Sequence, residues 1–370
     1  MKVGILTFHR SDNYGSALQA CALKYYINGI EGYDCKVIDY QPAVQKEFYS
    51  VYLKPTSIKN IVKNFRAFLY RTLLKDRKRG FESFQQGFLD GGISSITDEK
   101  VIEKELEKYD IIVCGSDQIW NPHSFDFSME YFAPTYSGKK IAYAPSSKKA
   151  IVDDYSNPTL VGDAIRSFSH LSVRERNGKE LIKQLTGRDA KVVLDPTLLL
   201  DQEDYLQFES EYKPDEPYIF FYSIDYNPQV VKMVELISKM TKLQVIVIFS
   251  SNKTFSVVKS SFKLTKHSAP GDFLSLIKNA DLVLTNSFHG TAFSVIYRKR
   301  FFALKPVVDG NLFVDVRINE LLENIHLEDR YLSHGEITGS IIDQPINFDE
   351  TLILQKRKES MDYLINALDH

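Results

Sequence analysis

Short apolar runs alternate with amphipathic segments along most of the chain. The first run, residues 2–8, meets polar residues at His9 and leads into a helical pattern over 16–30 and a strand pattern at 36–40. This alternation is typical of parallel βαβ units. Further strands of the same sheet are predicted at 111–114, 141–143, 171–174 and 191–194.

A second series of the same kind begins after the Asp195-Pro196-Thr197 break and the acidic stretch 201–215. Its predicted strands are 218–223, 244–249, 281–285 and 300–304, and its predicted helices are 228–240, 272–279 and 288–297. We therefore predict an α/β fold with two doubly wound parallel sheets, in which ligands sit beyond the carboxyl ends of the strands. The predicted domains are 1–200 and 201–347, followed by a closing helical segment, 348–370, that could cross back to either domain.

Residues 42–95 interrupt the alternation. Within 57–80 there are eight basic residues against one acidic residue, a net charge of +7. Apolar residues recur there at helical spacing, at Ile58, Ile61, Val62, Phe65, Phe68, Leu69, Leu73 and Leu74. The pattern predicts a basic amphipathic helix. Such a helix either packs on its domain with a charged face in solvent, or is attracted to an anionic membrane surface or a diphosphate-linked lipid carrier.

Composition excludes several classes of protein. The 370 residues are 44% hydrophobic and 25% charged, as in ordinary globular chains, and the net charge of −2 argues against nucleic acid as a partner. The scattered Cys21, Cys35 and Cys114 form neither a disulfide framework nor a metal knuckle. No apolar run approaches the ~18 residues that span a bilayer, and the first residues lack the features of a secretion signal. We therefore expect a cytoplasmic protein, associated with the inner membrane face if the basic helix binds lipid.

Motifs of cofactor and metal chemistry are missing from the sequence. There is no G-x-G-x-x-G, no G-x-x-x-x-G-K-[ST], no G-x-S-x-G, no H-E-x-x-H and no C-x-x-C. An Asp-x-Asp pair, which could hold a divalent ion against a diphosphate, is absent too. We therefore expect catalysis by side chains and backbone dipoles, with no metal and no cofactor.

Polar clusters follow two strands of the first series. Asn13 and Gly15 lie where the first helix is predicted to begin, so that free backbone N–H groups could bind an anion. Gly115, Ser116 and Asp117 follow the apolar strand IIVC. Both clusters are candidate binding sites, and in both the alternative is a helix cap or a turn.

A third cluster contains arginine. Arg174 ends a predicted strand, where its guanidinium could bind a phosphate or carboxylate through two parallel hydrogen bonds. Arg176 shares the same strand face if the strand continues. The alternative is a structural ion pair of Arg174 with Glu175 or another acid.

The fourth cluster follows the strand predicted at 281–284. It brings His289 into the first turn of a helix, beside Asn286, Ser287 and Gly290. A histidine there can transfer protons near neutral pH, and the adjacent N–H groups favour an anion. The alternative is a histidine with a structural role.

Five segments together resemble the polysaccharide pyruvyl transferase family: TFHRSDNYGSALQACAL, VCGSDQIWN, IAYAPSS, LSVRERNG with a following LDPTLL, and NADLVLTNSFHGTAFSVIYRKRFFAL. The likeness extends from position 3 to about 304. It implies a GT-B-like fold with two Rossmann-like domains facing a cleft. It also implies transfer of a pyruvate ketal from phosphoenolpyruvate to two hydroxyls of a sugar, in a surface polysaccharide or its lipid-linked precursor.

The resemblance also implies residue roles. A histidine at the start of a helix in the C-terminal domain transfers protons in that family, and it matches His289. The arginine of the S-V-R motif, which binds the donor, matches Arg174. One departure concerns Ser287, since relatives commonly carry arginine there. Its place would be taken by Arg176, Arg298 or Arg317, or the donor would differ.

The chemistry of ketal formation fits this residue set. It needs one acid–base group that works near pH 7 and a cationic clamp. We assign Asp117 to orienting or deprotonating the acceptor hydroxyl. Two other hypotheses stay open: a metal-independent GT-B glycosyltransferase that uses a nucleotide sugar, and a non-catalytic glycan-binding protein on the same scaffold.

Overall fold

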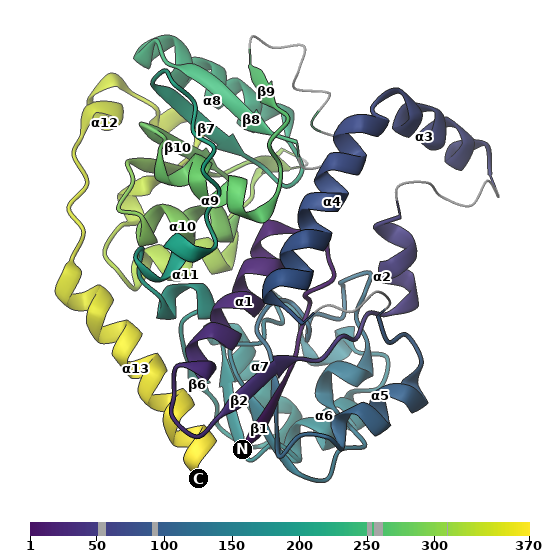
Figure 1. The fold of residues 1–370 in the computed structure, drawn as a ribbon. Helices are drawn as coiled ribbons and strands as arrows, with labels where there is room; N and C mark the ends of the chain where they lie inside the picture. Colours follow the sequence, from purple (N-terminus) through teal and green to yellow (C-terminus); the bar gives the residue numbers. More distant parts are fainter. Residues whose placement is uncertain (51–56, 91–94, 250–253, 255–261, 309) are drawn as a thin grey trace. The chain divides into compact units, whose positions relative to one another are not determined.

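The computed structural model describes residues 1–50, 57–90, 95–249, 254, 262–308 and 310–370 (Figure 1). These residues form two compact units. Unit 1 comprises Met1–Lys54, Glu82–Leu200 and Leu354–His370, and unit 2 comprises Pro55–Phe81 and Asp201–Ile353.

Unit 1 is built on a parallel sheet of six strands in the order β2-β1-β3-β4-β5-β6. The strands are β1 (Lys2–Leu6), β2 (Asp34–Val37), β3 (Ile111–Cys114), β4 (Lys139–Ala142), β5 (His170–Val173) and β6 (Lys191–Val192). All four residues of β3 are buried. A continuous apolar strand of this kind is covered by other elements on both faces of the sheet.

The helices of unit 1 cover the two faces of this sheet. They are α1 (Tyr14–Asn28), α2 (Ala43–Phe48), α5 (Glu99–Leu106), α6 (Pro158–Arg166) and α7 (Arg176–Thr186), with short 3₁₀ turns at Met129–Phe132, Val152–Asp154 and Pro196–Leu199. Along α1, eleven of the fifteen residues are buried. This explains why its sequence shows little division into apolar and polar faces.

Unit 2 repeats the architecture, with the parallel strand order β14-β11-β10-β7-β8-β9. The strands are β7 (Tyr218–Tyr222), β8 (Gln244–Ile248), β9 (Lys263–Thr265), β10 (Leu282–Thr285), β11 (Phe301–Leu304) and β14 (Tyr331–Leu332). Separately, β12 (Val307–Val308) pairs antiparallel with β13 (Asn311–Leu312). The central strands β7, β10 and β11 are fully buried, which explains their continuous apolar runs.

Helices follow the strands in the 201–353 part of unit 2, with 3₁₀ turns at Asp204–Gln207, Glu328–Arg330 and His334–Glu336. The helices are α8 (Pro228–Thr241), α9 (Pro270–Lys278), α10 (Phe288–Ile296), α11 (Val316–Glu323) and α12 (Gly339–Asp343). Both α8 and α9 start at a proline, whose fixed φ suits a first helical position.

The basic segment at 57–80 differs from the single helix that the sequence predicts. It forms α3 (Ile58–Leu69) and the beginning of α4 (Arg71–Phe88), with a break at Tyr70. In α4 the apolar side is covered, since Phe81 and Phe84 are buried. The side chains of Lys59, Lys63 and Arg66 lie outside the described part of the chain.

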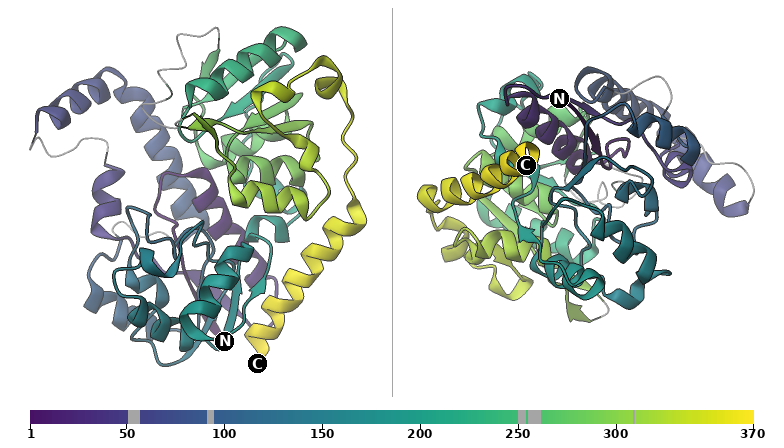
Figure 2. Two further views of the ribbon diagram at one scale, coloured as in Figure 1. Left: turned by 180° about the vertical axis from the view of Figure 1, so that it is seen from behind. Right: turned by 90° about the horizontal axis from the view of Figure 1, so that it is seen from below.

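The chain closes with α13 (Glu350–Asp369), shown in yellow in Figures 1 and 2. Its contacts with unit 1 are specific. Arg357 donates to the Leu198 carbonyl oxygen over 2.9 Å, and the Leu194 amide donates to the Ser360 hydroxyl over 3.0 Å. The C-terminal part of the helix therefore packs on unit 1, although in sequence it follows the strands of unit 2.

The strand order defines one switch point in each sheet. In unit 1 the chain crosses from one side of β1 to the other when it forms β3, and in unit 2 it crosses β7 when it forms β10. In open α/β sheets the loops at such a point diverge and leave room for a ligand at the carboxyl ends of the strands. The prediction of two doubly wound parallel sheets is confirmed. Among the described residues, no helix is long and apolar enough to cross a membrane.

Candidate functional site

The loop between β1 and α1 lies at the switch point of unit 1, between β1 and β3. Asn13 caps α1, since its Oδ1 accepts hydrogen bonds from the amides of Gly15 at 2.9 Å and Ser16 at 3.4 Å. Asn13 therefore acts as a helix cap, the alternative to a binding role that the sequence left open, and its side-chain oxygen is used for these hydrogen bonds.

The loop after β3 is built from residues that could hardly be exchanged. Gly115 has φ 128°, and a Cβ there would lie 2.0 Å from the carbonyl oxygen of Tyr143. Ser116 is fully buried. Its hydroxyl donates to the Ala144 carbonyl oxygen at 2.6 Å, and its amide donates to Gln19 Oε1 at 3.1 Å. These two residues shape the loop and leave it little freedom.

Asp117 joins the loops after β3 and β4 to helix α1. Its Oδ2 accepts the hydrogen bond of the Ser16 hydroxyl, which links the loop after β3 to α1. Its Oδ1 accepts from the Gln118 amide at 2.8 Å, and its backbone oxygen accepts from the Ser146 amide at 2.8 Å in the loop after β4. With an exposed fraction of 5% and φ 66°, Asp117 is held tightly in the switch point of unit 1.

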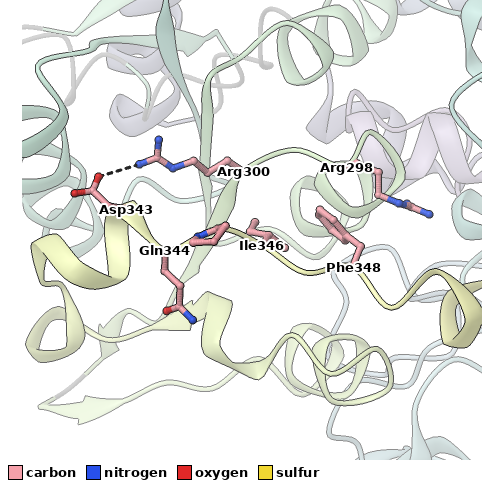
Figure 3. Close-up of a pocket in the computed structure, with 7 residues that line it drawn as sticks. Arg298, Arg300, Asp343, Gln344, Ile346 and Phe348 are labelled. Carbon is pink, nitrogen blue, oxygen red and sulfur yellow. Dashed lines mark ion pairs between the residues drawn. The ribbon is translucent and has the colours of Figure 1, made fainter.

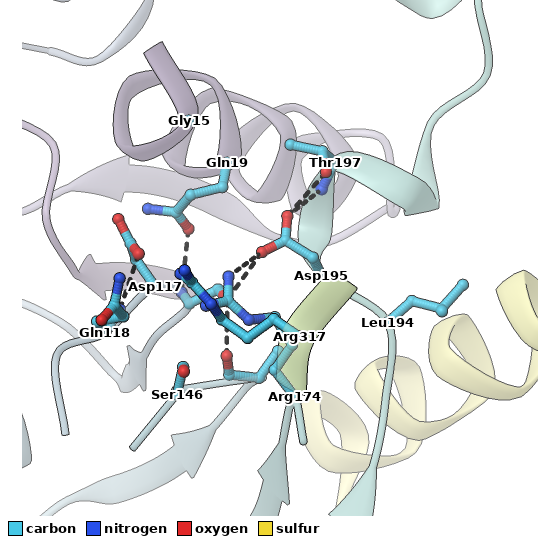
Figure 4. A network of polar contacts seen from close by, with 12 residues as sticks. Gly15, Gln19, Asp117, Gln118, Ser146, Arg174, Leu194, Asp195, Thr197 and Arg317 are labelled. Atoms are coloured by element: carbon cyan, nitrogen blue, oxygen red, sulfur yellow. Dashed lines mark hydrogen bonds and ion pairs between the residues drawn. The ribbon is translucent and has the colours of Figure 1, made fainter. Parts of the chain in front are cut away.

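Arg174 lies in a buried ion network at the same edge of the sheet (Figure 4). Its Nε donates to Glu175 Oε1 at 2.8 Å, and its Nη1 donates to Asp195 Oδ2 at 2.7 Å. Asp195 follows β6 and also accepts from the amide and hydroxyl of Thr197. The structural ion pair that the sequence offered as an alternative is therefore present, with a second carboxylate added.

The electrostatics of this network are unusual. Burial disfavours the charged form of Arg174, but the carboxylates of Glu175, Asp195 and Asp117 outweigh it and raise the pKa of the guanidinium. The side chains of Arg174, Glu175 and Asp195 are each at most 3% exposed. Since β5 ends at Val173, Arg176 does not extend its face and instead begins α7 as an exposed residue.

The second switch point places His289 at a helix N-terminus. Ser287 caps α10, and its hydroxyl accepts from the Gly290 amide at 3.5 Å. His289 is the second residue of the helix and is 6% exposed. A Cβ on Gly290 would lie 2.4 Å from Thr285 Oγ1, so glycine lets the first turn of α10 approach the end of β10.

Asn286 connects the two strands of this switch point. Its Nδ2 donates to Asp225 Oδ1 at 3.0 Å, which ties the loop after β10 to the loop after β7. Its Oδ1 is buried and has no hydrogen-bond partner among the described residues. Such an acceptor costs free energy unless a water or a ligand donates to it.

Two arginines of unit 2 lie at opposite ends of α10. Arg317 is 7% exposed, donates twice to Asp315, and has its guanidinium 6.0 Å from the centroid of the Phe288 ring. Arg298 follows the other end of the helix, where it donates to both carboxylate oxygens of Glu350. Because a nine-residue helix is about 13 Å long, only Arg317 is near the first turn of α10.

A surface cavity of about 280 Å³ lies near Arg298 (Figure 3). It is lined by Arg298, Arg300, Asp343, Gln344, Pro345, Ile346 and Phe348. Arg300 is paired with Asp343 at 3.8 Å and donates to the Ile342 carbonyl oxygen. The cavity is at the C-terminal end of α10, away from the carboxyl ends of the strands.

The predicted site residues thus gather at two sheet edges. The structure brings Asn13, Gly15, Gly115, Ser116 and Asp117 together in unit 1, and Asn286, Ser287, His289 and Gly290 together in unit 2. Two further carboxylates at these edges, those of Asp195 and Asp225, are not among the predicted site residues. Their signal was available, since each follows a strand whose carboxyl end meets the same edge as the predicted residues.

Comparison with solved structures defines the class of fold. The UDP-GlcNAc 2-epimerase of Methanocaldococcus jannaschii superposes with a TM-score of 0.54 at 14% identity, covering 99% of each chain. The UDP-N-acetylglucosamine 2-epimerase of Rickettsia bellii gives a TM-score of 0.54 at 9% identity, covering 100% of this chain and 96% of the other. The protein therefore has a GT-B-like α/β fold with two Rossmann-like domains.

The family model for polysaccharide pyruvyl transferase matches residues 13–306. The chain belongs to this family of transferase enzymes, and all four polar clusters lie within the matched residues. No match is found among curated protein sequences.

Proposed function

We propose that this protein transfers a pyruvate ketal from phosphoenolpyruvate to two hydroxyls of a sugar, in a surface polysaccharide or its lipid-linked precursor. The observation that carries the proposal is the place of His289, in the first turn of α10 at the switch point of unit 2 and within the matched family region. An imidazole can give and take a proton near neutral pH, and a helix N-terminus favours a bound anion.

The reaction balances with a single acid–base group. His289 protonates the methylene carbon of phosphoenolpyruvate, and the first sugar hydroxyl attacks the neighbouring carbon. Phosphate leaves, and the second hydroxyl attacks the same carbon to close the ketal. Of the two hydroxyl protons, one ends on the new methyl group by way of His289 and the other ends on phosphate. Asp117 is proposed to orient or deprotonate the first hydroxyl.

Donor binding is assigned to unit 2. The free N–H groups at the start of α10 would hold the phosphate or carboxylate of the donor. Arg317, buried beside Phe288, is the arginine proposed to take the place of the one missing at Ser287. The expected donor contact of Arg174 stays a prediction. Since its guanidinium already donates to Glu175 and Asp195, we assign Arg174 first a positioning role.

We further propose that the enzyme works in the cytoplasm on a lipid-linked acceptor, without metal or cofactor. The basic segment 57–80 supports a peripheral contact with anionic membrane at the inner face.

The test supplies phosphoenolpyruvate with a panel of lipid-linked oligosaccharides and follows phosphate release and product mass together. The expected result is one phosphate released for each ketal added to the acceptor. Binding and turnover of a nucleotide sugar, with none of phosphoenolpyruvate, would replace the proposal with the glycosyltransferase hypothesis. Binding of a glycan without turnover of either donor would indicate a binding protein.

A histidine variant tests the assigned role. His289→Ala should lower turnover by about 10²–10⁴-fold, the usual contribution of a positioned acid–base group. Thermal unfolding should change little. His334→Ala, which removes an exposed histidine of the same unit, is the control and should keep full activity. A folded His289→Ala enzyme with nearly normal turnover would remove His289 from the mechanism.

A further inference from the structure

Helix α3 exposes four large apolar side chains. Between one half and two thirds of the surface of each is accessible to solvent: Ile61 54%, Phe65 63%, Phe68 52% and Leu69 57%. The spacing i, i+4, i+7 and i+8 places the four on one face of the helix. Ala67, on the far side of the helix, is 3% exposed. These four side chains therefore point to solvent, whereas the small side chain of Ala67 is covered.

This orientation is the reverse of what packing on a protein core produces. A surface helix normally turns its apolar stripe inward and its polar residues outward. Helix α3 has 12 residues, a length at which an isolated helix is only marginally stable in water. Contiguous exposed apolar surface of this kind marks an interaction site.

The charge around α3 specifies the partner. The segment 57–80 has a net charge of +7, whereas the whole chain has −2. Arg71, Lys75 and Arg79 of the adjoining α4 are exposed. The guanidinium of Arg71 lies 4.6 Å from the centroid of the Phe68 ring, so positive charge borders the apolar face. The basic residues would be attracted to an anionic surface, and the exposed apolar side chains of α3 would be buried in an acyl layer.

We propose that α3 docks in the interface of an anionic lipid membrane. Ile61, Phe65, Phe68 and Leu69 enter the boundary between headgroups and acyl chains, and the basic residues of α4 contact the acidic headgroups. Aliphatic and aromatic side chains beside basic ones are the composition of helices that lie in a membrane interface. The contact is peripheral and depends neither on the donor nor on the acceptor of the enzyme.

Vesicle flotation of the full chain tests the proposal without any substrate. We expect binding to vesicles of phosphatidylcholine with phosphatidylglycerol, weaker binding to phosphatidylcholine alone, and loss of the difference at high salt because exposed charges are screened. The variant Phe65→Ser/Leu69→Ser should lower the partition coefficient by about tenfold or more. The control Leu160→Ser/Leu354→Ser, which removes two leucines that are 47% and 55% exposed, should bind normally.

A fluorescence readout locates the contact directly. The only native tryptophan, Trp120, is 3% exposed. Phe65→Trp should therefore show a new blue shift on addition of acidic vesicles, while Leu354→Trp should not. Absence of vesicle binding, or equal binding by Phe65→Ser/Leu69→Ser, would overturn the proposal. So would a dimer of the native chain that this variant converts to monomers, because a second copy would then cover α3.

Discussion

The two switch points share one topology and differ in what fills them. In unit 1 the loops after β3, β5 and β6 bring together four buried charged residues, Asp117, Arg174, Glu175 and Asp195. Arg174 donates to Glu175 and Asp195, and Ser116, the neighbour of Asp117, also donates to Asp195. In unit 2 the loops after β7 and β10 bring together hydroxyls, an amide, the exposed carboxylate of Asp225 and His289 at a helix N-terminus.

This difference separates residues that support the loops from residues that are available to react with a ligand. A buried charge that is already bonded to an opposite charge is costly to redirect, because removal of one partner leaves the other unpaired in a poorly solvated place. The N-terminus of α10 can take up an anion without breaking such a pair. We therefore interpret the ion network of Arg174, Glu175 and Asp195 as the support that fixes the loops of unit 1, and the unit 2 cluster as the place of proton transfer.

The largest expected effect concerns Arg174. Arg174→Met should lower the free energy of unfolding by about 3–5 kcal/mol, since it leaves Glu175 and Asp195 without their cation. The measurement is urea unfolding. The control is Arg166→Met, which breaks a pair of the same unit whose side chains are 48% and 64% exposed. Exposed pairs contribute about 0–1 kcal/mol, so this variant should stay close to the native protein.

A different result for Arg174→Met would change the roles assigned to the two switch points. If Arg174→Met unfolds like the native chain but loses affinity for phosphoenolpyruvate, Arg174 is a donor ligand and the donor site belongs to unit 1. His289→Ala should show the converse pattern, with normal unfolding and reduced turnover.

The sequence predicts the sheets well and their edges poorly. The strands predicted at 111–114 and 218–223 match β3 and β7, because central parallel strands are apolar on both faces and give continuous runs. Strands β9 and β14 have three and two residues and were not predicted. Edge strands this short contain too few positions to show any period.

The site is predictable in part for a similar reason. Residues that directly follow an apolar strand, such as Asp117 and His289, can be identified from the sequence because the strand indicates where they lie. The position of Asp195 after a predicted strand places it at the same edge, but its ion pair with Arg174 cannot be predicted, since the two are 21 positions apart and meet only through the pairing of β5 with β6. An amphipathic pattern likewise predicts which residues of α3 form its apolar face, but it does not predict whether that face contacts the protein core or solvent.

An intermediate effect is expected at Asp39, which follows β2 and belongs to the same edge of unit 1. Its carboxylate accepts from Arg10 Nε at 2.6 Å and lies 3.1 Å from His9 Nε2. Burial opposes ionisation, but Arg10 and His9 outweigh it and lower the pKa of Asp39. Asp39→Asn should cost about 2 kcal/mol of unfolding free energy at pH 7.

The sign of the pH dependence follows from the lowered pKa. The contribution of Asp39 is fully present above its unfolded pKa of about 4 and is lost as the pH falls further, through the depressed folded value. The gap between native protein and Asp39→Asn, measured by urea unfolding from pH 7 down to pH 3, should therefore narrow only below about pH 4. Asp163→Asn, from an exposed pair, should show almost no gap. A gap that narrows already at pH 6 would show that the Asp39 carboxylate is not the group that titrates.

The smallest effect on the free energy of unfolding is expected at Asn13, where a structural role can be distinguished from substrate binding. Asn13→Ala removes the cap of α1 and should cost about 1 kcal/mol, whereas Asn13→Ser should retain most of the stability because serine also caps helices. Asn157→Ala, at the cap of α6 in the same unit, is the matched control with a similar cost. If unit 1 is framework, Asn13→Ser leaves KM for donor and acceptor unchanged. A raised KM with normal unfolding would show that the Asn13 amide binds substrate, and Asn13 would then join Asp117 as a substrate-contacting residue of unit 1.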